Sequence, residues 1–396
     1  MRLTHLSLTD FRSYAAAELH PDGGLTIVAG PNGAGKSNLL EAVHVAITGR
    51  SHRAAADVEL VRHGQPFARV RLDLASGTAD GSPAADAPPA RIELVLPGEA
   101  ATPEIRKRLL VNGLARRAAS VSEVARSVLF RPEEMLLLIG APSERRRFLD
   151  AILAQRDRIA ARELAELARV LAQRNALLRA IRREEAGEEG LGFWDEQLAL
   201  TGARVMAARL ALVAEMDARL PDLHDAVAPR EEQDDRVRLT YLDTLKDAWP
   251  QRPDGADPVA LAAAFRRRIA DARQKELWNG VSLVGPHRDD LRVELAGRDV
   301  ATHASRGQQR TIIVAMKLAE RELLAGEGAP EPIVLLDDVF SELDPERAER
   351  TLGLLLERGQ VLVTTADLGL LPARRRRGVS VWNVGDGELR RAPKVA

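Results

Sequence analysis

Residues 30–37 read GPNGAGKS, a glycine followed by four residues and Gly-Lys-Ser, which is the pattern of a loop that binds nucleotide phosphates. Glycines let backbone N–H groups point at phosphate oxygens, and the start of a helix adds a partial positive charge. Lys36 would contact the β and γ phosphates of ATP, and Ser37 would bind Mg²⁺. The candidate nucleotide-binding residues here are Gly30, Pro31, Asn32, Gly33, Ala34, Gly35, Lys36, Ser37 and Asn38.

A second candidate half of the site lies far along the chain. Residues 333–344 read IVLLDDVFSELD, an apolar strand that ends in two carboxylates. Asp337 would hold Mg²⁺ directly or through water, and Asp338 would polarise the attacking water. Two acids after a strand can also form a solvated turn, but a phosphate loop in the same chain favours a nucleotide site. Lys36 and Asp338 are therefore the candidate catalytic residues, and Ser37 and Asp337 the candidate metal ligands.

A third motif, ASRGQQR at residues 304–310, opens an amphipathic helix. The Ser305 hydroxyl and the free amides near Gly307 and Gln308 could form a second phosphate cradle. This cradle cannot serve the nucleotide of Lys36 if both helices pack on one sheet, so we expect it to meet the γ phosphate bound by another protomer. The motif alone could be an ordinary helix cap. Its place shortly before the double aspartate favours an ATP-sandwiched dimer.

The elements around these motifs are predicted by hydrophobic periodicity. An apolar run at residues 25–29 predicts a strand before the phosphate loop, and Leu39, Val43 and Ala46 share one face of a helix after it. Short alternating strands occur near both ends of the chain. Residues 76–90 (SGTADGSPAADAPPA) lie between two such strands, and their small residues and prolines predict a flexible hairpin tip.

The middle of the chain reads as helix. A long amphipathic helix is expected from Pro142, a second from Trp194 to its end at Pro221, and a third from Pro258 to Trp278. Strand character then returns. We therefore predict an N-terminal head segment, a helical lobe and a C-terminal head segment, at residues 1–140, 141–280 and 281–396.

Composition restricts the class of protein. The 396 residues are 45% hydrophobic, which indicates a globular chain, and no run approaches the ~18 apolar residues of a membrane span. The net charge of -1 means that any nucleic-acid surface must come from local segregation of charge. The absence of cysteine excludes thiolate metal sites and fits a reducing compartment, so we expect a cytoplasmic protein.

The three motifs together look like the split ATPase head of the SMC and ABC superfamily. The apolar strand that ends in Asp337 and Asp338 resembles the Walker B strand of that superfamily, and residues 341–344 (SELD) follow it. Further strings resemble the RecF family of bacterial recombination mediators closely, whereas residues 155–280 match it only by length and helicity. These strings are LTDFRSY (8–14), KSNLLEAV (36–43), TGRSHR (48–53), PSERRRFLD (142–150) and GPHRDD (285–290).

This resemblance implies an α/β fold, a split ABC/SMC-type P-loop ATPase head with an inserted helical lobe. It also implies a weak ATPase that uses ATP and Mg²⁺ and forms a homodimer on gapped or junction DNA. The family cooperates with RecO and RecR to load recombinase onto single strands, in DNA repair, recombination, replication and the SOS response. Arg12 in the FR segment would touch the nucleotide, and Thr364 or Thr365 occupies a switch position.

Two departures from the superfamily concern hydrolysis. Asp338 replaces the usual catalytic glutamate and is one methylene shorter, and residues 130–134 (FRPEE) stand where a Gln loop is expected. Two other functions remain open. One is a nucleotide-regulated scaffold without turnover, and the other is the ATPase subunit of a membrane transporter, which the long spacing between motifs disfavours.

Clusters of arginine are the candidates for contact with a phosphate backbone, although most charge runs are solvated faces. His287, Asp289 and Asp290 have no second histidine spaced to share a metal, and we interpret them as structural or interfacial. The arginine clusters lie at residues 106–108, 116–117, 145–147, 266–268 and 374–377.

Overall fold

The computed structural model describes residues 1–75, 89–228, 236–245, 257–326, 328–376, 379–385 and 387–392. Most of the predicted hairpin tip at 76–90 lies outside them. Contacts within the chain divide it into two compact units. The first comprises Met1–Glu134, Leu223–Pro229 and Arg310–Ala396, and the second comprises Met135–Asp222 and Arg230–Gln309. These bounds differ from the predicted boundaries at 141 and 281, because further strands pair within the second unit.

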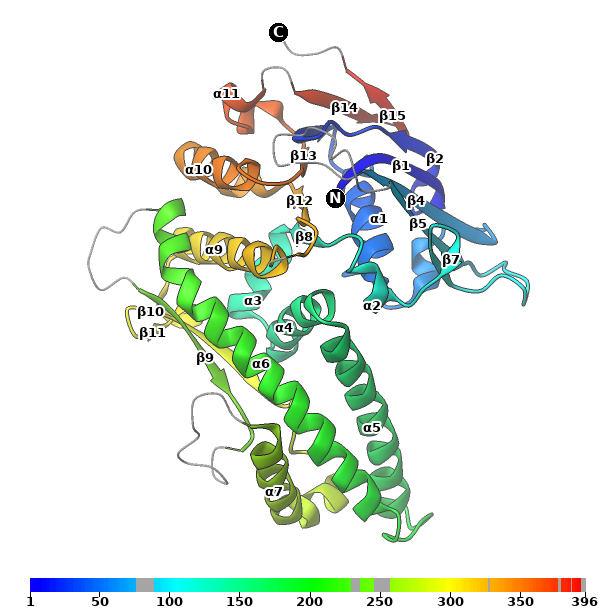
Figure 1. Ribbon diagram of the computed structural model, residues 1–396, viewed down its shortest axis with the longest axis vertical. Helices are drawn as coiled ribbons and strands as arrows, with labels where there is room; N and C mark the ends of the chain where they lie inside the picture. Colours follow the sequence, from blue (N-terminus) through cyan, green and yellow to red (C-terminus); the bar gives the residue numbers. More distant parts are fainter. Residues whose placement is uncertain are drawn as a thin grey trace. The chain divides into compact units, whose positions relative to one another are not determined.

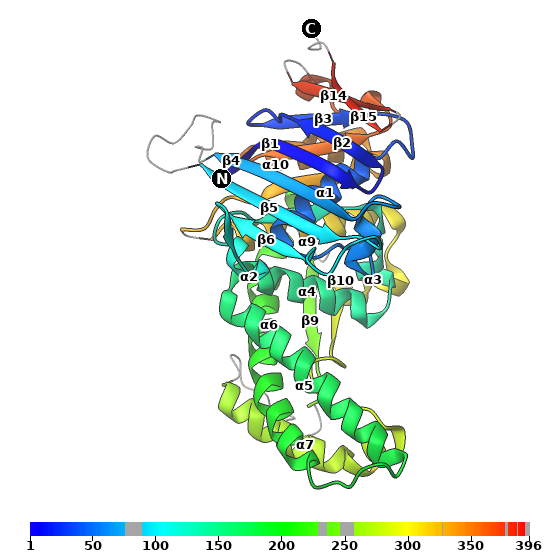
Figure 2. The ribbon, with the colours of Figure 1, turned by 90° about the vertical axis from the view of Figure 1, so that its right-hand side faces the viewer.

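The first unit contains an antiparallel sheet in the order β2-β1-β4-β5-β6-β7 (Figure 2). Alternating residues of its central strands are buried, as expected for a sheet with one face on the core. A register shift between Leu3 and His5 of β1 puts Leu3, Leu6 and Leu8 on the buried face. The strands are β1 (Arg2–Phe11), β2 (Tyr14–Leu19), β4 (Phe67–Ala75), β5 (Ala90–Pro97), β6 (Arg108–Val111) and β7 (Leu114–Ala115).

A second sheet of the same unit has the order β15-β14-β3-β13-β12-β8, and all its pairs are parallel except β14 with β15. Its central strands are continuous apolar runs, because helices or the other sheet cover both faces. The strands are β3 (Leu25–Ala29), β8 (Ser127–Phe130), β12 (Ile333–Asp337), β13 (Val361–Thr365), β14 (Ser380–Gly385) and β15 (Glu388–Arg391).

Helix α1 (Lys36–Thr48) packs between the two sheets, and its apolar residues share one core with both (Figure 1). Gln360, 2% exposed, also joins the sheets. Its side-chain carbonyl accepts from the Leu3 amide, and its NH₂ group donates to the carbonyls of Leu3 and Asp22, all at 2.8 Å. The smaller helical elements of the unit are η1 (Asp57–Leu60), α2 (Ala118–Val121), η2 (Pro132–Met135), η3 (Val339–Glu342), α10 (Pro345–Leu356), η4 (Leu368–Leu370) and α11 (Ala373–Arg376).

The second unit is mostly helical, and α5 and α6 run along each other in both views (Figures 1 and 2). It also holds a three-stranded sheet in the order β11-β10-β9. Helix α9 begins in this unit and continues into the first. The elements are α3 (Leu136–Ile139), α4 (Pro142–Arg156), α5 (Arg158–Arg182), α6 (Leu191–Val227), β9 (Val237–Leu242), α7 (Pro258–Asn279), β10 (Asp290–Leu295), β11 (Arg298–Asp299), α8 (Val300–His303) and α9 (Arg306–Leu324).

Two predicted helix ends are wrong. The helix expected from Pro142 is divided at Asp157, whose extended backbone ends α4 and whose carboxylate accepts from the Ile159 amide to cap α5. Pro221 lies inside α6 rather than at its end. A proline removes one helical hydrogen bond, and the complete burial of Leu220 and Val227 on either side outweighs that loss.

Helix α6 is long and apolar enough to cross a membrane by length and composition, a test that core helices of soluble proteins also pass. Within it, Arg209 is 2% exposed and donates to both carboxylate oxygens of Asp150, at 2.8 and 2.9 Å. A buried arginine that pairs inside the protein is typical of a core helix. We therefore interpret α6 as a core helix, and the cytoplasmic location stays a prediction.

Candidate functional site

The phosphate loop joins β3 to α1, and two of its glycines have backbone angles that favour glycine. Gly33 and Gly35 have φ values of 81° and 105°. A Cβ on Gly35 would lie 2.7 Å from the Ser13 hydroxyl oxygen. The Tyr14 hydroxyl donates to the Gly35 carbonyl at 3.0 Å. The turn between β1 and β2 thus packs directly against the end of the loop, where only glycine fits.

Lys36 is the first residue of α1, and its side chain turns back onto the loop. Its ammonium group donates to the carbonyls of Gly30 and Pro31, both at 2.9 Å. The residue is only 7% exposed. A buried cation against the first turn of the loop is placed where phosphate oxygens would gather.

The Walker B strand is β12. It lies in the same sheet as β3, the strand before the phosphate loop, and β13 lies between them. Ser37 Oγ donates to Asp337 Oδ1 at 2.8 Å, and Thr364 Oγ1 donates to the same oxygen at 2.7 Å. Register pairs Asp337 with Thr364 directly. Thr365 has different partners, since its hydroxyl donates to the Asp367 carbonyl at 2.8 Å. Of the two threonines considered, Thr364 is therefore the one at the site.

Asp338 follows the strand in an unusual conformation. Its backbone is left-handed, with φ 51° and ψ 27°, which aspartate tolerates at a small cost. Its amide donates to the Thr364 carbonyl and hydroxyl at 3.2 Å each. Within the described residues, its buried Oδ1 has no hydrogen-bond partner. A buried carboxylate oxygen without a donor suits a group that meets a ligand.

The residues brought together fit a nucleotide with its metal ion. Hydroxyl and carboxylate oxygens such as Ser37 Oγ and those of Asp337 are the ligands that Mg²⁺ prefers. The glycines of the loop keep side chains away from its backbone amides. In the described part of the chain, no group of three or more His, Asp or Glu side chains forms a metal centre of its own.

Glu41, one turn into α1, organises the residues around the loop and was not predicted. Its carboxylate is fully buried and accepts from Arg12 at 3.0 and 3.1 Å, from Arg53 at 2.5 Å and from Ser51 at 2.6 Å. Burial opposes its charge, but these hydrogen bonds outweigh burial and lower the pKa of Glu41 to about 2. The only signal in the sequence was its place in KSNLLEAV, because a lone glutamate on a helix usually faces water.

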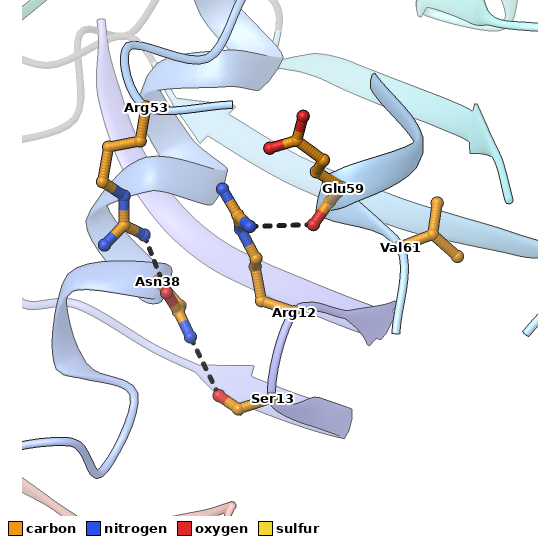
Figure 3. A pocket seen from close by; sticks show the side chains of 6 residues that line it. All are labelled: Arg12, Ser13, Asn38, Arg53, Glu59 and Val61. Carbon is orange, nitrogen blue, oxygen red and sulfur yellow. Dashed lines mark hydrogen bonds between the residues drawn. The ribbon is translucent and has the colours of Figure 1, made fainter. Parts of the chain in front are cut away.

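Arg12 lies beside the loop, with a left-handed backbone at φ 52°. It also donates to the Glu59 carbonyl at 2.8 Å. Asn38 accepts from Arg53 at 2.8 Å and donates to the Ser13 hydroxyl at 3.0 Å (Figure 3). The resulting open pocket, of about 490 Å³, is lined by Arg12, Ser13, Asn38, Arg53, Glu59 and Val61.

The third motif caps α9. The Ser305 amide donates to Gln308 Oε1 at 2.9 Å, and the Gln308 amide donates to Ser305 Oγ at 3.3 Å, which is a reciprocal capping box. Both residues are exposed, and Gly307 between them is partly buried. They belong to the second unit, whereas Lys36 and Asp337 belong to the first. The motif is thus an exposed helix start, but the Gln308 amide, which was expected to be free, donates to the Ser305 hydroxyl.

The segment in the Gln-loop region follows β8, which pairs with β12. Register sets Phe130 opposite Leu336, so the next residue, Arg131, emerges beside the two aspartates. Arg131 Nε lies 3.1 Å from Glu134 Oε1, and Glu134 is 7% exposed. The Arg131–Glu134 ion pair thus lies at the edge of the sheet, in the region where the superfamily has its Gln loop.

Two arginine clusters hold carboxylates, one of them largely buried and the other at the surface. Arg145 donates to both carboxylate oxygens of Asp290, at 2.6 and 2.9 Å, and Arg146 donates to the Asp289 carbonyl at 2.7 Å. Hydrogen bonds therefore join the two motifs PSERRRFLD and GPHRDD. This agrees with a structural role for Asp289 and Asp290. Arg266 likewise donates to Glu196 through two nitrogens at 2.7 Å.

Comparison with known proteins agrees with this geometry. The family model described as RecF/RecN/SMC N terminal domain matches residues 2–382. A DNA replication and repair protein RecF from Heliobacterium modesticaldum is 36% identical over 99% of this chain and 100% of its own length. The protein of that name from Roseiflexus castenholzii is 37% identical over 98% of this chain and 99% of its own length.

Solved structures agree with the sequence comparison. A structure of the recombination mediator protein RecF with ATP, in the RecFOR pathway, has a TM-score of 0.83 and 26% identity, over 99% of this chain and 98% of its own. An SMC head bound to the C-terminal winged-helix domain of ScpA has a TM-score of 0.54 at 16% identity, over 99% of this chain and 97% of its own, which shows the common fold alone. The predicted fold class is confirmed, and the chain belongs to the RecF family.

Proposed function

We propose that this protein is an ATP-dependent DNA-binding clamp of recombination, repair and replication recovery. The observation that carries the proposal is the convergence of Ser37, Asp337 and Thr364 beside the phosphate loop, at 2.7 and 2.8 Å. This convergence brings both candidate magnesium ligands into contact. RecF relatives and RecF structures with ATP support the same reading.

The proposed roles follow from the contacts of each side chain. Lys36 and backbone N–H groups of the phosphate loop bind the phosphates, and Ser37 and Asp337 hold Mg²⁺, which when bound neutralises phosphate charge. Asp338, with its unpaired Oδ1, polarises the water. Thr364 orients Asp337 through its hydrogen bond. Arg12 positions the β1–β2 turn through Glu41, and its contact with nucleotide stays a prediction.

The exposed helix start of α9 supports the proposed homodimer. Ser305 and Gln308 satisfy each other's amides, and both face solvent. A phosphate that displaced the two side chains would meet both amides at the start of the helix. We propose that the motif, with Gly307, meets the γ phosphate held by a second protomer, so that ATP joins two chains.

The DNA partner is proposed from the family and from the charges. Gapped DNA or a single-strand/double-strand junction is the proposed ligand, and RecO, RecR and recombinase are the proposed protein partners. The net charge of -1 requires the binding surface to be local. Doubling that surface in a dimer should increase the number of phosphate contacts.

The test measures DNA affinity on gapped, duplex and single-stranded ligands with ATP, ADP and no nucleotide, across a range of salt concentrations. We expect the tightest binding and the steepest salt dependence with ATP, because each phosphate contact contributes a log-log slope of about -0.9. Affinity should ignore base sequence. Identical slopes with and without ATP would contradict the clamp.

Turnover of ATP, measured with and without DNA, separates the proposal from its alternatives. A weak ATPase that DNA stimulates fits the clamp. Nucleotide-dependent DNA binding without any turnover would instead identify a regulated scaffold. Strong DNA-independent turnover, with no affinity for DNA, would favour a transporter subunit.

A further inference from the structure

Strands β6 and β7 form a hairpin at the edge of the first unit's antiparallel sheet (Figure 1). Its turn is Asn112-Gly113, with φ values of 51° and 79°, which is the pattern of a tight two-residue turn. Asn112 also accepts from the Arg91 amide at 2.7 Å, through its side-chain oxygen. The tip of the hairpin is thus anchored to β5 and has a defined shape.

An apolar side chain stands directly after this turn. Leu114 is 61% exposed, although its cross-strand neighbour Val111 is only 9% exposed. In the described part of the first unit, Leu370 is the one other large aliphatic or aromatic side chain of comparable exposure, at 40%. A single exposed leucine is common on protein surfaces, so it is the charges beside Leu114 that point to a ligand.

Four guanidinium groups flank this tip, and they are exposed. Among the described residues, no carboxylate lies within ion-pair distance of any of them. Lys107, in the middle of the run, differs because it pairs with Asp57 at 2.9 Å. The four residues are Arg106, Arg108, Arg116 and Arg117.

The placement of these charges opposes the folding of the hairpin. The Arg116 amide donates to the Leu109 carbonyl at 2.8 Å, which extends the ladder beyond β7. A further step of this register would set Arg108 opposite Arg117, which lies beyond β7 at the start of α2. Like charges at such positions repel each other, and a bound polyanion would remove that cost. Arg145 and Arg266, in contrast, hold carboxylates.

We propose that residues 106–117 form a wedge that recognises the junction between duplex and single-stranded DNA. Leu114 packs on the terminal base pair, and the four arginines contact phosphates on either side. Apolar side chains between basic groups serve this purpose in proteins that unstack DNA. This inference rests on the proposed DNA binding. It explains how the protein would recognise the structure of the DNA and not its base sequence.

The charges and the length of the edge favour DNA over a protein strand. Strand β7 has two residues, which is too short to pair with an added strand along its length. A protein partner would have to supply four or more carboxylates in a matching arrangement. A DNA backbone supplies such charges at regular spacing.

The test compares wild type with Leu114→Ser and with the double variant Arg116→Glu/Arg117→Glu, all with ATP and Mg²⁺. The ligands are a blunt duplex and a duplex of equal length with a single-stranded extension and 2-aminopurine in the terminal pair. Val259→Ser, at a site in the second unit that is 74% exposed, is the matched control. Thermal melting checks that each variant folds.

We expect wild type to bind the junction more tightly than the duplex and to raise 2-aminopurine fluorescence. Leu114→Ser should bring the ratio of the two affinities towards one and lose the fluorescence rise, whereas Val259→Ser should change neither. The double variant should weaken binding to both ligands and reduce the log-log salt slope by about 1.8.

Three results would overturn the wedge while leaving DNA binding intact. These are an unchanged affinity ratio and fluorescence in Leu114→Ser, an unchanged slope in the double variant, and a changed oligomeric state by light scattering with unchanged DNA binding. The last would identify a protein interface. If wild type binds no DNA in any nucleotide state, the proposed function itself fails, and the wedge fails with it.

Discussion

The hydroxyl of Ser37 donates to the carboxylate of Asp337 across 2.8 Å, although 300 residues separate them in the chain. The first lies at the start of α1, and the second ends β12. Residues from the two ends of the chain thus meet in one sheet, with β13 and Thr364 between them. The site exists only when both head segments have folded together.

Lys36→Ala should abolish ATP binding, because it removes the side-chain cation that contacts the loop carbonyls at 2.9 Å. Titration calorimetry with ATP and Mg²⁺ measures this. Lys275→Ala, on the exposed side of α7, is the control and should bind as wild type does. Binding by Lys36→Ala within twofold of wild type would contradict the assignment.

Asp338→Asn should keep ATP binding and slow hydrolysis, because an amide is a much weaker base than a carboxylate. The ATP dimer should then persist longer. Light scattering followed after ATP addition measures its lifetime. Equal lifetimes for wild type and the variant would indicate that another group activates the water.

Ser305→Arg should bind ATP as a monomer but fail to dimerise, because the bulky cation would block the exposed start of α9. A mixture with a Lys36→Met protomer tests this further. The two variants should together form a dimer with one intact composite site, which neither forms alone. Loss of ATP binding by the Ser305→Arg monomer would show that the motif does not act in trans.

Glu41→Gln should destabilise the protein by about 3 kcal/mol near neutral pH, since one pKa unit corresponds to ~1.4 kcal/mol. The folded-state pKa of about 2 lies below the usual 4.5. The contribution of Glu41 is therefore complete above pH 4.5 and is lost as the pH falls towards 2. Denaturant unfolding of both proteins between pH 3 and 8 measures the difference, which should shrink only at the acid end.

Arg145→Glu should reduce stability by at least about 2 kcal/mol, because it faces Asp290 with a second carboxylate. Arg147→Glu is the matched control on the same helix. Its side chain is 66% exposed and pairs only with Glu144 in the described residues, so we expect a change below about 0.5 kcal/mol. Equal unfolding midpoints for the two variants would argue against the structural role of Arg145.

Much of the site could be predicted because its residues act through local backbone patterns. The phosphate loop needs glycines before a helix, and the acidic pair needs a buried strand, so both motifs could be located, and Ser37 and Asp337 do lie in contact. Thr364 lies within β13, and its hydroxyl donates to Asp337. Their roles in binding and hydrolysis remain proposals.

Other features depend on contacts between residues that are far apart in the sequence, and no local pattern predicts such contacts. A run of arginines looks the same whether it faces water or a carboxylate, so the bonds of Arg145 to Asp290 could not be predicted. Pro221 signalled a helix end, yet tertiary burial of Leu220 and Val227 overrides it. Glu41 was missed for the same reason, since its three donors come from two other segments of the chain.

The convergence on Glu41 also makes its donors thermodynamically dependent on one another. Arg12 comes from the β1–β2 turn, and Ser51 and Arg53 come from the segment after α1, yet all three donate to one carboxylate. Once that carboxylate is gone, removing a second member of the group should cost little more. Their individual mutational effects should therefore sum to more than the effect of removing them together. This part of the molecule behaves as one energetic unit assembled from three stretches of chain.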